Sequence, residues 1–315
     1  MDKLESFHQD VLRGLKDHPK WLQPKYFYDD NGAALFQRIM EMPAYYLTAC
    51  ELEIFRDKTV ELAEVLHIQQ EPFDLIELGA GDAMKSSFLL EHLLREQANF
   101  TYMPIDICGE VLLTLRDRLN RDLPNLEVVP LHGEYLDMLR EATEQSDRRK
   151  IVLFLGSNIG NMELEDAHGF CRTVNRRLKV GDTMLIGFDL QKNPHTILEA
   201  YNDKEGITAA FNLNLLERIN RELDADFNIS TFQHYQTYDP IDGGCRSYLV
   251  SGTAQKVNMG GEVISFEANE PIAVEVSRKY TPLEIDQMAI ETGFAPLTQI
   301  ADNKNWFVDA IWQVN

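Results

Sequence analysis

A buried strand that runs straight into a glycine-rich loop and then into a helix constrains this chain more than any other feature. Residues 73–78 read FDLIEL, residues 79–82 read GAGD, and residues 84–97 have a helical pattern. Strands and helices keep alternating after this point. The pattern predicts strands at 100–107, 126–131, 150–157 and 182–190, and helices at 109–123 and 164–178. Crossover connections of this length predict an α/β domain, with a mostly parallel sheet that helices cover on both faces.

The alternation stops after residue 190. Residues 194–223 have a helical pattern, and short antiparallel strands are predicted in the next sixty residues. Thr281 and Glu284 then form a capping box for another helix, which two strands joined by the turn at 302–305 follow. The last hundred-odd residues therefore contain an insertion and then a return to the sheet as an antiparallel edge hairpin.

Charge and composition exclude several classes of protein. Lys+Arg 30 against Asp+Glu 51 gives a net charge of -21, which disfavours nucleic acid and anionic membrane partners. The first residues are helical and mixed in charge, and no apolar run approaches the ~20 residues of a membrane span, so we expect a cytoplasmic protein. The four cysteines form no C-x-x-C pair and the histidines no H-E-x-x-H pattern, so we expect reduced thiols and no metal site.

The glycine-rich loop does not fit a phosphate ligand. A dinucleotide fold needs a third glycine where this chain has Met84, and the G-K-[ST] of a phosphate-binding P-loop is absent. The ELGAGD loop, with Gly79 and Gly81, instead resembles the first loop of class I S-adenosylmethionine-dependent methyltransferases. That cofactor carries a sulfonium cation and no phosphate, so nearby acids such as Glu77 and Asp82 suit it.

Polar residues that follow the strands predict further cofactor contacts. Asp106 ends the second strand and can accept hydrogen bonds from both ribose hydroxyls. Glu134 and Tyr135 follow the third strand, where they could meet the adenine amino group and ring face. Lys85 begins the helix after the loop and could pair with the cofactor carboxylate. We therefore expect S-adenosyl-L-methionine as the cofactor.

The fourth strand ends in GSNIGN and indicates the kind of acceptor. The Asp/Asn-Pro-Pro-Tyr sequence of many DNA and protein amide methyltransferases is missing there. Small residues and the two amides of Asn158 and Asn161 leave room for a small molecule and offer it hydrogen bonds. The alternative is an ordinary strand-to-helix turn with Asn161 as a cap.

Six ordered stretches carry a resemblance that spans nearly the whole chain. They are PKYFYDDNGAALFQRI, MPAYYLT, IELGAGDAMKS, FLGSNIGN, the long GFDLQKNPHTILEAYNDKEGITAAFNLNLLERINRELDADF, and EVSRKY. Together they resemble the histidine-specific Nα-methyltransferases of ergothioneine biosynthesis, with the weakest match at 236–272. The resemblance implies a Rossmann-like class I methyltransferase core at 56–190 and 281–315. It also implies a smaller, discontinuous α+β domain at 1–55 and 191–280 that binds the amino acid.

The resemblance also assigns roles to particular residues. Tyr45, Asn161 and Tyr201 match positions that hold the substrate carboxylate. Tyr28 matches a position beside the amino group that is methylated, and it could relay a proton. Glu275 matches the acid that receives the imidazole ring. For the cofactor, Gly79, Lys85, Asp106, Glu134 and Tyr135 fall on motif positions, although the family has Asp-Phe where this chain has Glu134-Tyr135.

A sharper departure from the family lies beside the expected ring pocket. Aligning the TAQ stretch puts Ser247 where the histidine enzymes carry a methionine, which would make the pocket more polar and roomier. The expected function is S-adenosylmethionine-dependent N-methylation of the α-amino group of free histidine or a close relative, by a monomer. Transfer to an imidazole nitrogen or to another aromatic amino acid stays open. A non-catalytic cofactor-binding protein also stays open. So does a nicotinamide-dependent oxidoreductase, although Met84 occupies the position of the third glycine that such a fold needs.

Overall fold

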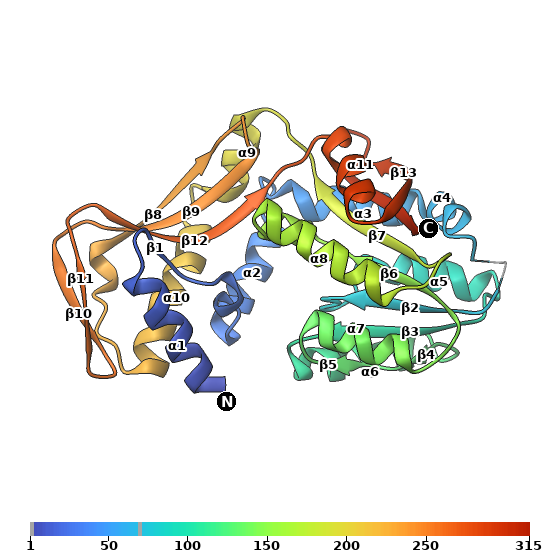
Figure 1. Cartoon of the computed structure of the whole chain (residues 1–315), viewed down its shortest axis with the longest axis horizontal. Coiled ribbons are helices and arrows are strands. Elements are labelled where there is room, and N and C mark those ends of the chain that lie inside the picture. The colour runs from blue at the N-terminus through green and yellow to red at the C-terminus, as the bar shows by residue number, and fades with distance from the viewer. Residues whose placement is uncertain (1–2, 69–70) are drawn as a thin grey trace. The chain divides into compact units, whose positions relative to one another are not determined.

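A computed structural model describes residues 3–68 and 71–315, and its chain divides into two compact units. The insertion unit extends to Tyr46 and resumes over Lys192–Arg278, and the sheet unit comprises Leu47–Gln191 and Lys279–Asn315. Each unit is described by itself (Figure 1). Residues 47–55, which we expected with the amino acid domain, fall in the sheet unit. Each unit is formed by two segments that are far apart in sequence.

The sheet unit is built on one eight-stranded sheet. Its strand order is β13-β14-β7-β6-β2-β3-β4, and β5 also pairs with β3. Strands β2 to β7 pair in parallel, whereas β14 is antiparallel to both β7 and β13. The strands are β2 (Phe73–Leu78), β3 (Phe100–Asp106), β4 (Glu127–Val128), β5 (Leu131–His132), β6 (Arg149–Phe154), β7 (Thr183–Asp189), β13 (Phe294–Ala301) and β14 (Phe307–Val314).

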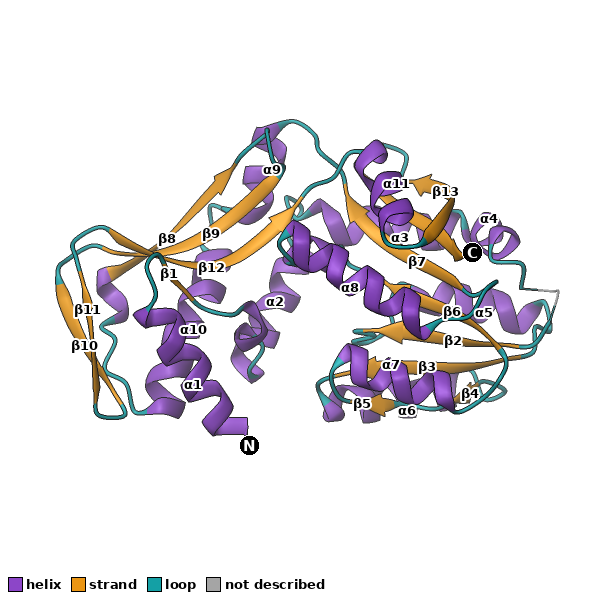
Figure 2. Ribbon diagram, viewed as in Figure 1, coloured by secondary structure: helices purple, strands orange, loops and turns teal. Residues whose placement is uncertain are grey.

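Helices connect these strands and cover the sheet (Figure 2). They are α3 (Tyr46–Asp57), α4 (Thr59–Val65), α5 (Ser86–Arg95), α6 (Gly109–Asp122), α7 (Tyr135–Glu144), the 3-10 turn η2 (Asn158–Asn161), α8 (Leu164–Arg177) and α11 (Pro282–Glu291). The predicted strand at 126–131 is interrupted, because only its two ends pair with β3. The predicted capping box of Thr281 and Glu284 is confirmed at the start of α11.

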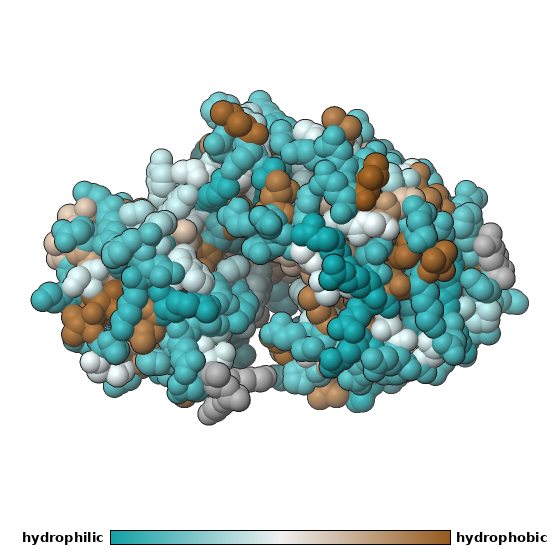
Figure 3. All heavy atoms as spheres, in the orientation of Figure 1, coloured by the Kyte–Doolittle hydropathy of each residue, from teal (hydrophilic) through white to brown (hydrophobic). Residues whose placement is uncertain are grey.

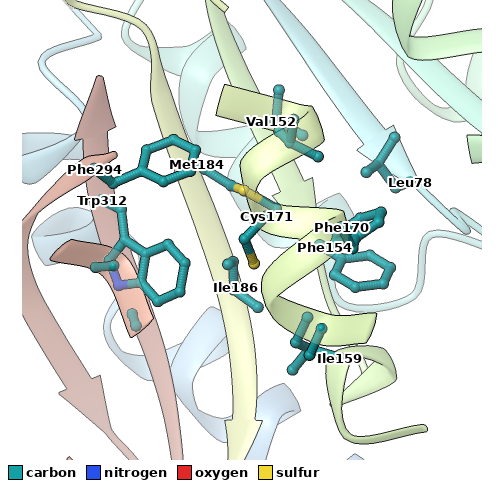
Figure 4. Close-up of a cluster of buried hydrophobic side chains, with 14 of the residues drawn as sticks. Leu78, Val152, Phe154, Ile159, Phe170, Cys171, Met184, Ile186, Phe294 and Trp312 are labelled. Atoms are coloured by element: carbon teal, nitrogen blue, oxygen red, sulfur yellow. The ribbon is translucent and has the colours of Figure 1, made fainter. Parts of the chain in front are cut away.

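The core of the sheet unit explains why its strands read as apolar throughout. Figure 4 shows Phe170 and Cys171 of α8 against Phe154 of β6 and Ile186 of β7. Trp312 of β14 is fully buried in the same cluster. The alternate residues of the central strands are buried as well: Leu75, Ile151, Leu153 and Leu185. Both faces of the sheet are therefore covered, as in other parallel sheets.

The insertion unit combines helices with strands that are antiparallel except for β1, which pairs with β12 in parallel. Strand order in its main sheet is β1-β12-β9-β8, and β10 and β11 form a separate hairpin. Its elements are α1 (Lys3–Lys16), β1 (Lys20–Trp21), the 3-10 turn η1 (Pro24–Phe27), α2 (Asp30–Glu41), α9 (Pro194–Tyr201), α10 (Ile207–Leu223), η3 (Ile229–Thr231), β8 (Phe232–Tyr238), β9 (Gly244–Ser251), β10 (Gln255–Met259), β11 (Glu262–Phe266) and β12 (Glu270–Arg278).

The helical pattern at 194–223 forms two helices instead of one. Gly206 has φ 74°, a left-handed conformation that ends the intervening turn. Asp203 accepts hydrogen bonds from the amides of Ile207 and Thr208 at 2.9 and 2.8 Å, and so satisfies the free amides at the start of α10. The DKEG stretch at 203–206 is therefore a helix boundary.

Helices α2 and α10 are joined by polar side chains at their crossing. Asp29 caps α2 by accepting from the Gly32 amide at 2.8 Å, and it also accepts from Asn214 at 2.7 Å and pairs with Arg221 of α10. A β-carbon on Gly32 would lie on the Phe27 carbonyl oxygen, so the tight turn needs glycine there. These contacts link the motif YDDNG to the motif NLLERINREL.

The surface agrees with the charge of the sequence. On the face in Figure 3 hydrophilic side chains predominate, and apolar side chains occur in small groups. Within residues 3–68 and 71–315, no helix combines the length and the apolar character that a membrane crossing would need. All four cysteines are free thiols, as expected.

Candidate cofactor and amino acid sites

The loop between β2 and α5 has the backbone shape that its glycines predict. Gly79 and Gly81 have φ of 73° and 54°, in the left-handed region that favours glycine. The Gly79 and Ala80 amides donate to the Ile105 carbonyl of β3 at 2.8 and 3.1 Å, which fixes the loop to the end of the neighbouring strand. The loop therefore lies at the carboxyl ends of parallel strands, where open α/β sheets bind ligands.

Asp106 holds this loop and the next one together. One carboxylate oxygen accepts from the Gly81 amide at 3.0 Å, and the other accepts from the Cys108 amide at 2.9 Å. Its side chain is partly exposed at the end of β3. A carboxylate has about four lone-pair positions, so two remain for the hydroxyls of a ribose.

Tyr135 lies directly beside the glycine-rich loop. A β-carbon at Gly79 would be 2.8 Å from the Tyr135 hydroxyl oxygen, so the glycine leaves room for that phenol. The ring stacks edge-on against Phe154, and burial, with the nearby charges of Asp106 and Glu134, raises the pKa of Tyr135 to about 12. The phenol is therefore a neutral hydrogen-bonding group at the base of the loop. Glu134 precedes α7 and its side chain is exposed.

Lys85 closes the loop at the start of α5. Its ammonium group pairs with Glu51 of α3. A β-carbon at Gly156, just after β6, would be 3.5 Å from the Lys85 Nζ. The lysine therefore lies where the loops after β2 and β6 meet, which is the position at which the strand order of the sheet reverses.

We expected Glu77 to face the sulfonium, but its side chain is buried. Its side chain is 3% exposed, and the Tyr102 hydroxyl donates to it at 2.6 Å inside the sheet unit. Burial raises the pKa of Glu77 to about 7, although hydrogen bonds with Ser86 and Tyr102 act in the opposite direction. The side chain is part of the interior below the loop.

This raised pKa makes stability depend on pH. The folded protein keeps a proton on Glu77 that the unfolded chain, with a value near 4.5, releases, so stability falls as pH rises from about 4.5 to 7. The loss is on the order of 3 kcal/mol for this shift. We expect Glu77→Gln, which can still accept from Tyr102, to unfold at higher urea than the wild type at pH 8. At pH 4.5 we expect the two to unfold alike, and equal midpoints at both pH values would contradict this prediction.

The loop after β6 contains the amides that the sequence singled out. Asn158 donates to the Leu155 carbonyl at 2.8 Å, so its amide serves the turn. Ser157 is left-handed, with φ 56°, and its hydroxyl accepts from the Asp189 amide at 3.1 Å. Asn161 ends the 3-10 turn and is partly exposed. Of the two amides, Asn161 is the candidate for a substrate contact.

A continuous row of aromatic rings in the insertion unit brings together three predicted substrate residues. Tyr28 packs edge-on against Phe36 at 5.5 Å, Phe36 against Tyr45 at 6.3 Å, and Tyr45 against Tyr201 at 5.9 Å between ring centroids. Phe211 of α10 packs against Tyr28 and Phe36. Tyr28 is 46% exposed at one end of this row, whereas Tyr201 is 7% exposed at the other.

Glu275 and Ser247 are neighbours on the sheet of the insertion unit. Glu275 of β12 is opposite Ser247 of β9, which is opposite Gln236 of β8, and residues directly opposite share one face of a sheet. The Ser247 hydroxyl donates to the Gln236 side-chain oxygen at 2.6 Å. Ser277, two residues after Glu275, is 2.8 Å from the Tyr201 hydroxyl. The row of rings therefore reaches the polar residues of this sheet at Tyr201, through its contact with Ser277.

The structure adds residues to the two candidate sites that the sequence did not indicate. Gln236 and Glu51 are partners of predicted site residues, and Phe36 links Tyr28 to Tyr45. Phe36 lies inside the NGAALFQRI motif, so this motif could have indicated Phe36 as a candidate site residue. Among residues 3–68 and 71–315, no three His, Cys, Asp or Glu side chains gather as metal ligands would.

The sheet unit defines the class of protein. Its strand order, the glycine-rich loop after the first sheet strand, and the aspartate at the end of the next strand form a class I S-adenosylmethionine-dependent methyltransferase core. The predicted fold class is confirmed.

Comparisons with known proteins then identify the family. The family described as "Histidine-specific methyltransferase, SAM-dependent" matches residues 7–314. The histidine N-alpha-methyltransferase of Mycobacterium tuberculosis is 33% identical over 279 residues, 88% of this chain and 85% of that protein. The enzyme of the same name from Mycolicibacterium smegmatis is 33% identical over 291 residues, 92% of this chain and 89% of that protein. Ergothioneine biosynthesis protein 1 of Neurospora crassa is 30% identical over 90% of this chain and 32% of that protein.

The chain belongs to the histidine-specific, S-adenosylmethionine-dependent methyltransferase family. The resemblance that the sequence indicated is thereby confirmed, together with methyltransferase activity and S-adenosylmethionine as the cofactor. Gly79, Lys85, Asp106 and Tyr135 lie around one loop. The Asp106 carboxylate fits the ribose hydroxyls of that cofactor, and the Lys85 ammonium group fits its carboxylate.

Proposed function

We propose that this protein methylates the α-amino group of free histidine, as a monomer in the cytoplasm. One observation carries the proposal: the chain is similar to two histidine N-alpha-methyltransferases over more than four fifths of its own length and of theirs. A net charge of -21 disfavours nucleic acid as the acceptor. The cofactor supplies the methyl group when it is bound.

The side chains of the protein have to orient the acceptor and remove water. Tyr45, Asn161 and Tyr201 are proposed to hold the carboxylate, because phenols and amides donate hydrogen bonds without adding a cation that would repel the sulfonium. Glu275 is proposed to accept an N–H of the imidazole. Such a two-ended grip fixes the amine for an in-line attack, which is the main requirement of this chemistry.

The amine must also lose a proton before it can attack, because an α-amino group is mostly protonated at neutral pH. Tyr28 is proposed to lie beside the amine. Tyr28 is exposed, and its hydroxyl can accept a hydrogen bond from the ammonium group, take up that proton and give its own O–H proton to water. The row of rings from Tyr28 to Tyr45 supplies the apolar surroundings that favour the neutral amine.

A panel of acceptors tests the proposed function. Purified protein would be incubated with S-adenosylmethionine and, separately, with histidine, ring-N-methylated histidines, tyrosine and tryptophan. Formation of S-adenosylhomocysteine measures turnover, and NMR of the product identifies the methylated nitrogen. We expect histidine to give the highest kcat/KM, with methyl on the α-nitrogen. Binding of the cofactor with no turnover of any acceptor would favour a non-catalytic protein. A methyl group on a ring nitrogen would mean that the enzyme methylates the imidazole instead of the α-amino group.

A specific observation favours a second acceptor class. Ser247 is hydrogen-bonded to Gln236 at the position opposite Glu275, so the neighbourhood of this acid is polar. A tyrosine side chain, with a phenol in place of an imidazole, could use these groups. This candidate would be preferred if tyrosine exceeded histidine in kcat/KM.

Glu275→Gln tests whether this acid binds the imidazole ring of histidine. An amide loses the charge that favours an imidazole N–H but keeps an oxygen that can accept. We expect kcat/KM for histidine to fall by about 10- to 100-fold, the worth of one charge-assisted hydrogen bond, with the KM for S-adenosylmethionine unchanged. Glu270→Gln, on the same strand but paired with Lys20, is the control and should leave both values unchanged. An equal loss in the two variants would contradict the role of Glu275.

A further inference from the structure

Glu51 is a buried acid in the sheet unit with contacts to two parts of the cofactor site. It lies on α3 and is fully buried. Its carboxylate pairs with the Lys85 ammonium, and both of its oxygens are 2.8 Å from the Gly156 amide nitrogen, which donates to them. Lys85 is the N-cap of α5, the helix after β2, and Gly156 follows β6. One side chain therefore ties together the two loops at which the strand order reverses.

The sheet below Glu51 is shaped to receive it. A β-carbon on Gly187 of β7 would collide with a Glu51 oxygen, so glycine at that position makes room for the carboxylate. Gly187 is opposite Asp309 of β14, another fully buried acid. Neither oxygen of Asp309 has a hydrogen-bond donor among the described residues, and burial together with the charge of Glu51 raises its pKa well above the usual range. The neutral form of Asp309 is therefore favoured beside Glu51.

Lys85 is the exposed member of this cluster. Its side chain is 20% exposed, against 1% for Glu51, so the ammonium group lies at the boundary between the interior and the ligand side of the sheet. An ammonium group has three N–H donors. One is used by Glu51, which leaves donors for a carboxylate that arrives from the ligand side.

We propose that Glu51 is a positioning residue for the cofactor, which holds the Lys85 ammonium and the Gly156 amide where the amino acid tail of S-adenosylmethionine binds. This inference rests on the proposed contact between Lys85 and the carboxylate of that tail. Without Glu51 the four-carbon lysine side chain keeps its charge but has to be ordered by the ligand itself, at a cost in affinity. Glu51 contributes nothing to the adenosine end of the cofactor.

Calorimetry with two ligands tests the proposal. S-adenosylhomocysteine has the amino acid tail, and 5′-methylthioadenosine has the same adenosine and sulfur without it. We expect Glu51→Gln to weaken S-adenosylhomocysteine about tenfold, within the range of one charge-assisted hydrogen bond, and to leave methylthioadenosine unchanged. The glutamine amide can donate to Asp309, so the fold should tolerate this change. If Glu51→Gln does not fold, Glu51→Asp, whose carboxylate is withdrawn by one methylene, must weaken S-adenosylhomocysteine selectively in the same way.

A double-mutant cycle shows whether Glu51 acts through Lys85. Lys85→Met should also weaken S-adenosylhomocysteine selectively, and adding Glu51→Gln to it should cause no further loss. Asp309→Asn makes the same acid-to-amide change in the neighbouring buried acid and should alter neither affinity more than twofold. Unchanged binding in Glu51→Gln, equal weakening of both ligands, or full additivity with Lys85→Met would overturn the proposal. Failure of the wild type to methylate histidine would leave these binding results intact, so the two failures are distinguishable.

Discussion

Asp106→Ala is expected to weaken binding of S-adenosylhomocysteine by about 100-fold, which corresponds to roughly 2.7 kcal/mol. Two contributions add. The carboxylate accepts from the Gly81 and Cys108 amides and so holds two loops at the ends of β2 and β3. Its remaining lone pairs are proposed to receive the ribose hydroxyls as charge-assisted hydrogen bonds. Calorimetric titration of the purified variant measures the loss.

Asp82→Ala is the matched control for this experiment. Asp82 lies in the same glycine-rich loop and caps a single amide, that of Met84 at 3.0 Å, from an exposed position. We expect its removal to change the affinity by less than threefold, because S-adenosylhomocysteine is a neutral thioether and carries no sulfonium for this acid to attract. If Asp106→Ala bound S-adenosylhomocysteine within threefold of the wild type, the ribose contact would have to be assigned to another side chain.

The parts of the fold that could be predicted are those with a local signal. The strands from Phe73 to Asp189 are apolar because both faces of the sheet are covered, and this pattern is visible in the sequence alone. The glycines at 79 and 81 and the capping box at Thr281 are equally local, because backbone conformation and short-range hydrogen bonds require those residues. The boundary at Gly206 had such a signal in DKEG, which the helical periodicity on either side outweighed.

The residues that could not be predicted depend on partners far away in the chain. Glu51 has the sequence context of an exposed acid on an amphipathic helix, and its burial follows from contacts with residues more than thirty positions away, at Lys85 and Gly156. Glu77 follows an apolar run before the loop, which gives no indication of whether it faces the ligand or the interior. Gln236 lies where the family resemblance is weakest, and only the pairing of β8 with β9 brings it to Ser247. Tertiary contacts of this kind leave no periodicity in one sequence.

Lys279→Met is expected to destabilise the sheet unit by about 3–5 kcal/mol, because it leaves a fully buried carboxylate without its cation. Lys279 and Asp189 are each 0% exposed, and the Lys279 Nζ is 2.7 Å from an Asp189 oxygen. The pair joins the motif GFDLQK, which contains Asp189, to the motif EVSRKY, which contains Lys279. At these two motifs the chain leaves the sheet unit and returns to it. The Tyr280 amide donates to the Asp189 carbonyl at 2.9 Å, and the Gln191 amide donates to the Tyr280 carbonyl at 2.9 Å, so the backbone supports the same junction.

Urea unfolding of three variants distinguishes the buried pair from an ordinary ion pair. Lys179→Met removes the partner of Asp147, whose side chain is fully exposed, and should leave the unfolding midpoint unchanged. Asp189→Leu combined with Lys279→Met replaces both buried charges by apolar groups and should recover most of the stability lost in the single variant. Recovery would show that the cost of Lys279→Met comes from the uncompensated charge of Asp189. If the double variant were less stable than Lys279→Met alone, Asp189 would instead stabilise the junction through its other contacts, among them the hydrogen bond from its amide to Ser157.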